Sequence, residues 1–305
     1  MLKLNRRALW ELAELTDREV GATLMGQRDA PPAQNRLEAV GMTVSSALPT
    51  AVEAWRPLMS RLGVRARLVG AFSFGAPQIE VSDPAGKPRR GPLADLMMIV
   101  DDLRPTFAGR TALLIRAGLQ AEAVGGPPEA GACALRDLYD TWPAFRFRRR
   151  GYAESPRDLR GEMAADNPGR RATISLRPGG WSLDAANGDV GLTLGRLLAL
   201  MATGAEGRPA TRGGEDDWSV TVDELLKETV QATLRGLASP TPALRSATTF
   251  VGEAGTGHVL FENPTDRNYE QAVGVAGLEG PISVVHLCLD AAPRPAGRAG
   301  RTSTS

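Results

Sequence analysis

The sequence predicts an α/β fold in which a mixed central sheet is flanked by helices and followed by a helical C-terminal extension. Two observations support this prediction. Apolar residues recur with helical spacing over residues 4–26 and 36–62, and again over 191–203 and 217–236. Between these helical regions, residues 64–119 contain short apolar runs separated by turns rich in Gly and Pro, which is typical of neighbouring strands.

The two N-terminal helices have recognisable ends. The first ends before Pro31 and Pro32, because proline interrupts a helical pattern. The second carries an apolar stripe that includes Trp55, and Gly63 suits its C-terminal cap. Residues 1–62 are therefore expected to form a helical region that leads into the first strand.

The rest of the chain divides according to its apolar runs. Strands are predicted over residues 64–74, 78–82, 93–100, 111–119, 171–178, 257–263 and 282–289, and a further helix over 130–141. The expected parts are a core over 63–180, a helical extension over 181–240, a strand-containing region over 241–290 and a disordered tail over 291–305.

Composition limits the classes of protein that remain. The chain has 305 residues, and 42% of them are hydrophobic, which is ample for a core. No run approaches the roughly 18 consecutive apolar residues of a membrane-spanning helix, so no membrane contact is expected. Cys133 and Cys288 lie far apart, and we interpret them as reduced, buried residues of a cytoplasmic protein. The net charge of +1 does not by itself indicate a nucleic-acid partner.

The most informative motif lies in the two strands predicted over 93–100 and 111–119. Asp95 opens the first of them, and the second ends in Arg116-Ala117-Gly118. This arrangement resembles the core of the PD-(D/E)XK nuclease superfamily, also called restriction-endonuclease-like, in which the second strand ends in (Glu or Gln)-x-Lys. Tyr139-Asp-Thr-Trp-Pro-Ala-Phe145 extends the likeness, because it resembles a Tyr-x-x-Trp-Pro-x-Phe element in an uncharacterised bacterial group of that superfamily.

The resemblance implies a restriction-endonuclease-like sheet and a Mg²⁺ site. In that sheet the strands over 93–100 and 111–119 would be adjacent, and Asp95 would lie close to the backbone of residues 116–118. Asp95 would be the metal ligand, and Glu53, on the helix before the first strand, would be the upstream carboxylate. Arg116 and Gly118 fall on catalytic positions, where a guanidinium cannot bind Mg²⁺ and Gly supplies no cation. The chain has three lysines, and only Lys87, in a predicted turn, lies near these strands in sequence. If the protein is active, it is a Mg²⁺-dependent DNA endonuclease; the two departures favour an inactive one.

Four arginines close together form the densest positive cluster: Arg146, Arg148, Arg149 and Arg150. They are candidates for contacts with DNA phosphates. The alternative is a solvated strand edge, because charges on an edge discourage aggregation. Elsewhere, Asp101 and Asp102 follow the predicted strand and are interpreted as loop acids, and His286 as a core residue.

Two functions therefore remain open. The first is a restriction-endonuclease-like protein that binds or processes DNA with an impaired Mg²⁺-dependent site; the resemblance associates such proteins with anti-phage defence. The alternative is a non-catalytic protein-interaction or scaffold subunit of a multi-protein complex. The expected partner is DNA in the first case, and another protein or a second copy of the chain in the other.

Overall fold

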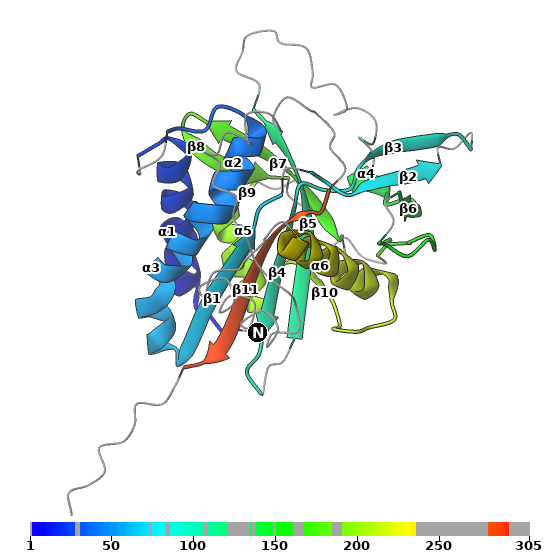
Figure 1. Ribbon diagram of the computed structural model, residues 1–305. Helices are drawn as coiled ribbons and strands as arrows, with labels where there is room; N and C mark the ends of the chain where they lie inside the picture. The colour runs from blue at the N-terminus through cyan, green and yellow to red at the C-terminus, as the bar shows by residue number, and fades with distance from the viewer. Residues whose placement is uncertain are drawn as a thin grey trace, which may run out of the picture.

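The computed structural model describes residues 2–27, 31–73, 75–82, 86–105, 109–120, 135, 138–148, 151–161, 167–184, 191–235 and 280–292. Their fold is α/β, as predicted: a large mixed sheet lies between helices, and a small sheet projects from one side (Figure 1). No helix in this part of the chain is long and apolar enough to cross a membrane.

The helices agree with the predicted helical regions. They are α1 (Arg6–Leu24), α2 (Arg36–Met42), the π-helical turn η1 (Thr43–Ala47), α3 (Leu48–Arg61), α4 (Leu138–Thr141), α5 (Leu194–Thr203) and α6 (Asp217–Arg235). Asn5 caps the start of α1 by accepting a hydrogen bond from the Ala8 N–H at 2.8 Å. Gly63 follows α3 with φ 68°, in the left-handed conformation predicted for its C-terminal cap.

The strands are β1 (Val64–Ala71), β2 (Gln78–Ser82), β3 (Pro88–Pro92), β4 (Leu96–Asp102), β5 (Gly109–Leu119), β6 (Phe145–Phe147), β7 (Gly169–Leu176), β8 (Gly179–Leu183), β9 (Leu192–Thr193), β10 (Arg208–Pro209) and β11 (Ser283–Ala291). The main sheet has the order β1-β11-β4-β5-β7-β8-β9, and β10 pairs with β5. The small sheet has the order β3-β2-β6.

The last strand lies in the middle of the main sheet. β11 runs antiparallel to β1 and parallel to β4. It therefore lies between β1, the strand that follows the N-terminal helices, and the central strands β4 and β5. The sequence places residues 241–290 in a region of their own, whereas the described end of that region belongs to the main sheet. The strand predicted over 257–263 and most of the helix predicted over 130–141 lie outside the described residues. The same holds for the tail predicted over 291–305, except that β11 extends to Ala291 and residue 292 is described.

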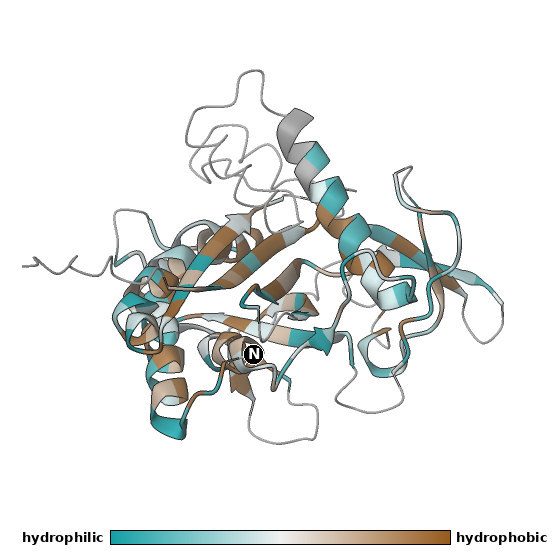
Figure 2. Cartoon of the chain, turned by 90° about the horizontal axis from the view of Figure 1, so that it is seen from below, coloured by the Kyte–Doolittle hydropathy of each residue, from teal (hydrophilic) through white to brown (hydrophobic). Residues whose placement is uncertain are grey.

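Each face of the main sheet has its own apolar core. One core joins alternate strand residues such as Met98 to α1, α3 and α5. The other joins residues such as Ile99 to α6 and the small sheet. Because successive side chains of a strand point to opposite faces, β4 is buried along its whole length. Figure 2 shows this as apolar strands enclosed by helices with polar outer surfaces.

Two acids at the end of β4 correct the sequence interpretation. Asp101 and Asp102 were expected in a loop, but both lie within β4 and are buried, at 0% and 1% exposure. The interpretation failed because each acid has a cationic partner, the buried Arg110 for Asp101 and the partly buried Arg104 for Asp102, and the local sequence pattern does not reveal these pairs.

The π-helical turn η1 packs very closely against β1. A Cβ atom at Gly70 would lie 2.2 Å from the carbonyl oxygen of Val44, so only glycine allows this approach. The long helical region predicted over 36–62 is interrupted at this point of contact.

Replacing Gly70 with Ala is therefore expected to lower the free energy of unfolding by about 1–3 kcal/mol, because the backbone of η1 would have to move. Gly180→Ala in β8 is the matched control, since a Cβ there meets nothing within 4 Å. Chemical denaturation of both variants measures the difference, and equal stability of the two would refute the proposed close packing.

Candidate functional site

Asp95 lies immediately before β4 and beside the neighbouring strand β5. Its N–H donates to the Ile115 carbonyl at 2.9 Å, and its carboxylate accepts a hydrogen bond from the Ala117 N–H at 2.9 Å. β4 and β5 are adjacent and antiparallel, with Leu96 opposite Ile115. The prediction that the two strands are neighbours, with Asp95 close to the backbone of residues 116–118, is therefore confirmed.

Two arginines hold the Asp95 carboxylate. Arg36, the first residue of α2, forms an ion pair with its Oδ1 atom. The Arg116 guanidinium lies 3.1 Å from the same oxygen. The side chain of Asp95 is 8% exposed, and those of Arg36 and Arg116 are 22% and 26% exposed. Two half-buried guanidinium groups thus compensate the charge of a nearly buried carboxylate. This avoids the free-energy cost of burying a charge without a partner.

The sequence motif predicted that Arg116 lies beside Asp95, but no part of the sequence analysis predicted Arg36 there. Arg116 falls on the strand that resembles the nuclease motif. Arg36 lies in the N-terminal helical region, and no sequence pattern links its charge to Asp95. The contact exists because α2 packs against β5 in the folded chain.

The carboxylates on the upstream helices have other roles. Glu53 is exposed on α3 and forms an ion pair with Arg56 on the same helix. Glu38 accepts hydrogen bonds from the Gln34 N–H and the Asn35 side chain, both at 2.7 Å, at the start of α2. It therefore completes a reciprocal cap with Asn35. These contacts connect Glu53 and Glu38 to their own helices and not to Asp95.

The groups around Asp95 do not fit Mg²⁺. The ion requires about six oxygen ligands in near-octahedral geometry. One oxygen of Asp95 already receives two guanidinium groups, and the other receives a backbone N–H. Within the described residues, the one group of three His, Cys, Asp or Glu side chains close enough to share an ion does not include Asp95.

Beside Asp95, two arginines on neighbouring strands lie in register. Arg116 in β5 is opposite Arg171 in β7, and Gly118 is opposite Thr173. Arg171 forms an ion pair with Asp140 at 2.6 Å. Among the described residues, a Cβ atom at Gly118 would come within 4 Å only of the Ala172 carbonyl oxygen, at 3.9 Å, so a Cβ fits at this position.

The Tyr-x-x-Trp-Pro-x-Phe element packs against this end of the sheet. The Tyr139 hydroxyl donates to the Leu93 carbonyl at 2.8 Å, and burial raises the pKa of Tyr139 well above its ordinary value. The Trp142 indole donates to the Asn167 side chain at 2.8 Å. Phe145 is 1% exposed. The element therefore has a structural role: it covers the strand ends next to the Asp95 group.

The predicted DNA-binding arginines lie in and after β6, in the small sheet. Arg146 and Arg148 are exposed. Arg146 is in register with Glu80, whose carboxylate pairs with Arg90 at 2.7 Å. Arg149 and Arg150 lie outside the described residues. Arg146 and Arg148 form no ion pair with any residue that the structure describes.

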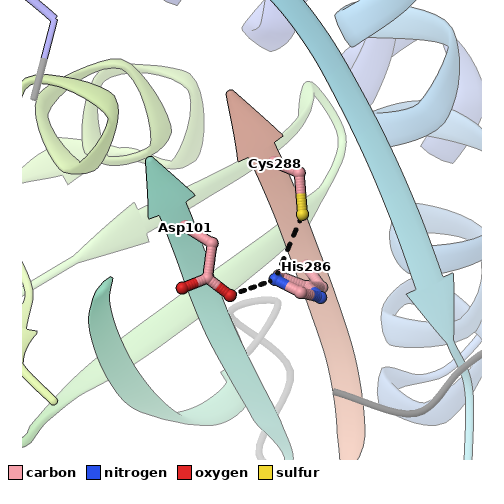
Figure 3. Close-up of side chains that lie close together, drawn as sticks. All are labelled: Asp101, His286 and Cys288. Atoms are coloured by element: carbon pink, nitrogen blue, oxygen red, sulfur yellow. Dashed lines mark hydrogen bonds and ion pairs between the residues drawn. The ribbon is translucent and has the colours of Figure 1, made fainter. Parts of the chain in front are cut away.

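A second cluster of polar side chains is buried at the other end of β4 (Figure 3). Asp101 accepts from Arg110 on β5 at 3.0 Å and contacts His286 on β11 at 2.8 Å. Arg212 lies 2.9 Å from the same carboxylate, and Arg110 also pairs with Asp223 of α6 at 2.7 Å. Burial raises the pKa of Asp101, but the hydrogen bonds and charges of His286 and Arg110 outweigh it and lower the pKa to about 2.

Cys288 completes the group without forming a catalytic relay. Its Sγ lies 3.4 Å from His286 Nε2, the same nitrogen that contacts Asp101. One nitrogen cannot both take the thiol proton and donate its own proton to Asp101, as a nucleophile–base–acid relay requires. Burial and the Asp101 charge raise the Cys288 pKa to about 12, so the thiol stays protonated. We interpret Asp101, His286 and Cys288 as a structural cluster, because Asp101 is already neutralised by Arg110 and Arg212.

Asp101→Asn is expected to lower the free energy of unfolding by about 3–5 kcal/mol at neutral pH, because the buried cations lose their counter-charge. The folded pKa of about 2 lies below the ordinary value of 3.8, so the Asp101 contribution is complete above pH 4. It is lost as pH falls from about 4 to about 2.

The stability difference between wild type and Asp101→Asn should therefore narrow over that pH range, as measured by denaturant unfolding. Asp158→Asn is the control, since its ion pair with Arg160 is on the surface. A difference that stays constant down to pH 2 would contradict the low pKa.

Comparison with known proteins identifies no relative of this chain. No family model matches the chain, and neither a curated protein nor a solved structure matches it significantly. The resemblance to restriction-endonuclease-like proteins therefore stays a prediction from the motif residues.

Proposed function

We propose that this protein binds DNA through its phosphates and does not cleave it. The observation that carries the proposal is the pair of guanidinium groups on Asp95. In the superfamily that the motif resembles, a nuclease would hold its metal ion at the aspartate in this position. Here Arg36 and Arg116 occupy the carboxylate instead, which favours an anion as the ligand of this surface.

Arg116 and Arg171, which lie opposite each other in β5 and β7, offer N–H donors for a phosphate. A guanidinium has about five N–H donors, and the contact with Asp95 uses only some of those on Arg116. Like charges directly opposite on neighbouring strands destabilise a sheet, so Arg116 and Arg171 depend on the carboxylates of Asp95 and Asp140. A phosphate oxygen between the two guanidinium groups would add further compensation and form charge-assisted hydrogen bonds.

The exposed arginines of the small sheet supply a second set of contacts. Arg146 and Arg148 have no acid partner among the described residues, so no internal ion pair has to break when they meet a phosphate. Contacts with phosphates carry no direct sequence information, so the proposed binding is independent of DNA sequence.

The double variant Arg116→Gln, Arg171→Gln is expected to bind duplex DNA several-fold more weakly, because two phosphate contacts are lost. The slope of log affinity against log salt should fall by about one to two units. Arg146→Gln with Arg148→Gln should act in the same direction. Fluorescence anisotropy over a salt series measures both effects.

Arg61→Gln is the matched control, because Arg61 is exposed at the end of α3, away from both sets of arginines. Absence of DNA binding at low salt would reject this proposal and favour a scaffold subunit. Binding that neither double variant changes would reject these arginines as the contacts.

Cleavage is expected to be absent in the unmodified protein, with Mg²⁺ or Mn²⁺, because the carboxylate of Asp95, the metal ligand that the resemblance implies, is occupied by two arginines. The triple variant Arg36→Glu, Arg116→Gln, Gly118→Lys supplies a second carboxylate, a Gln and a Lys, and a Cβ atom fits at position 118 without a close contact to the described residues. It should gain metal-dependent nicking of plasmid DNA. Robust nicking by the unmodified chain that disappears in Asp95→Ala would show that the protein is a nuclease after all.

A further inference from the structure

A groove of about 780 Å³ lies along α1 and the start of α5, in the helical layer opposite α6. Its volume is within the usual range of about 300–1,000 Å³ for small-molecule sites. Side chains with charge or aromatic character line it: Arg6, Arg7, Trp10, Glu14, Asp17 and Arg196.

The three arginines of the groove have no ion-pair partner among the residues that the structure describes. Arg6, Arg7 and Arg196 are exposed, and none forms an ion pair within the described part of the chain. Arg6 and Arg7 lie in the first turn of α1 and Arg196 in the first turn of α5, and neither turn contains an acid. The positive end of each helix dipole therefore adds to the charge of these arginines, which makes this part of the groove favourable for an anion.

Two acids, Asp17 and Glu14, also line the groove, and its three arginines outnumber them by one. Asp17 accepts a hydrogen bond from the Gly195 N–H at 2.8 Å and so caps α5. Burial raises the pKa of Asp17, which outweighs the lowering by its hydrogen bonds with Thr193 and Gly195. Glu14 is exposed and lies one turn beyond Trp10 on α1.

Trp10 is the exposed aromatic surface of the groove. Its side chain is 63% exposed, whereas Trp55, Trp142, Trp181 and Trp218 are all buried, at 4% or less. Each buried indole donates a hydrogen bond to a neighbouring group. Trp10 follows Arg6 and Arg7 by one helical turn, so the indole and both guanidinium groups lie on neighbouring positions of α1.

We propose that this groove binds a nucleoside phosphate, with the base stacked on Trp10 and the phosphates held by Arg6, Arg7 and Arg196. An indole ring can stack on any base, and a guanidinium group can donate two parallel N–H hydrogen bonds to two oxygens of a phosphate. The ligand is a free nucleotide or a nucleotide of a single strand, which share this chemistry. The site is separate from the Asp95 group and does not depend on the DNA-binding proposal.

The test is titration of the full chain with ATP, followed by calorimetry and by Trp fluorescence. Stacking should quench the exposed Trp10, and Trp10→Phe should remove most of that signal. Trp10→Ala is expected to weaken ATP binding about tenfold, since stacking contributes about 1–3 kcal/mol per base. Arg196→Gln and the double variant Arg6→Gln, Arg7→Gln should each weaken it several-fold.

Three controls make the result specific. Arg61→Gln should bind ATP like wild type, and so should Arg116→Gln with Arg171→Gln, which separates this site from the DNA surface. Tripolyphosphate without a base should bind more weakly than ATP. A short single-stranded oligonucleotide that binds more tightly than ATP, with the same dependence on Trp10, would identify the strand as the source.

No binding of ATP or oligonucleotide at millimolar concentration would overturn the proposal. Equal affinity of wild type and Trp10→Ala would overturn the stacking contact. Tripolyphosphate binding as tight as that of ATP would also reject a base in the groove.

Discussion

The buried ion pair between Asp101 and Arg110 is the interaction on which the arrangement of the main sheet depends. Both side chains are nearly inaccessible to water, and a buried charge without a partner is strongly destabilising. β4, β5 and β11 must therefore bring Asp101, Arg110 and His286 together, and Asp223 fixes α6 to the same group. The C-terminal strand is thus tied to the centre of the sheet by charge as well as by its backbone ladder.

Asp95, just before β4 at its opposite end, is compensated in the same way. Each aspartate is held by two arginines from different parts of the chain: Arg110 and Arg212 at Asp101, and Arg36 and Arg116 at Asp95. The difference lies in Arg110, which is fully buried against Asp101, whereas both arginines at Asp95, like Arg212, are partly accessible to solvent. One end of β4 is consequently a structural cluster, and the other is the surface that we propose meets DNA.

The sequence predicted local elements well, since apolar periodicity reflects which face of a helix or strand is buried. It also predicted that Asp95 lies beside the backbone of residues 116–118. It did not predict Arg36 on Asp95, or His286 on Asp101, because these pairs join residues 59 and 185 positions apart. Their contact depends on how α2 and β11 pack, and local patterns carry no information on that. Glu53 was chosen as the upstream carboxylate from its position in the sequence, which likewise carries no information on packing.

The most direct test of the account is a crystal structure of the protein soaked with Mn²⁺, in which anomalous scattering locates the ion. We expect no Mn²⁺ at Asp95, and the Arg36 and Arg116 guanidinium groups should remain against its carboxylate. An Mn²⁺ ion bound to Asp95, with these arginines displaced, would contradict the claim that guanidinium groups have replaced the metal.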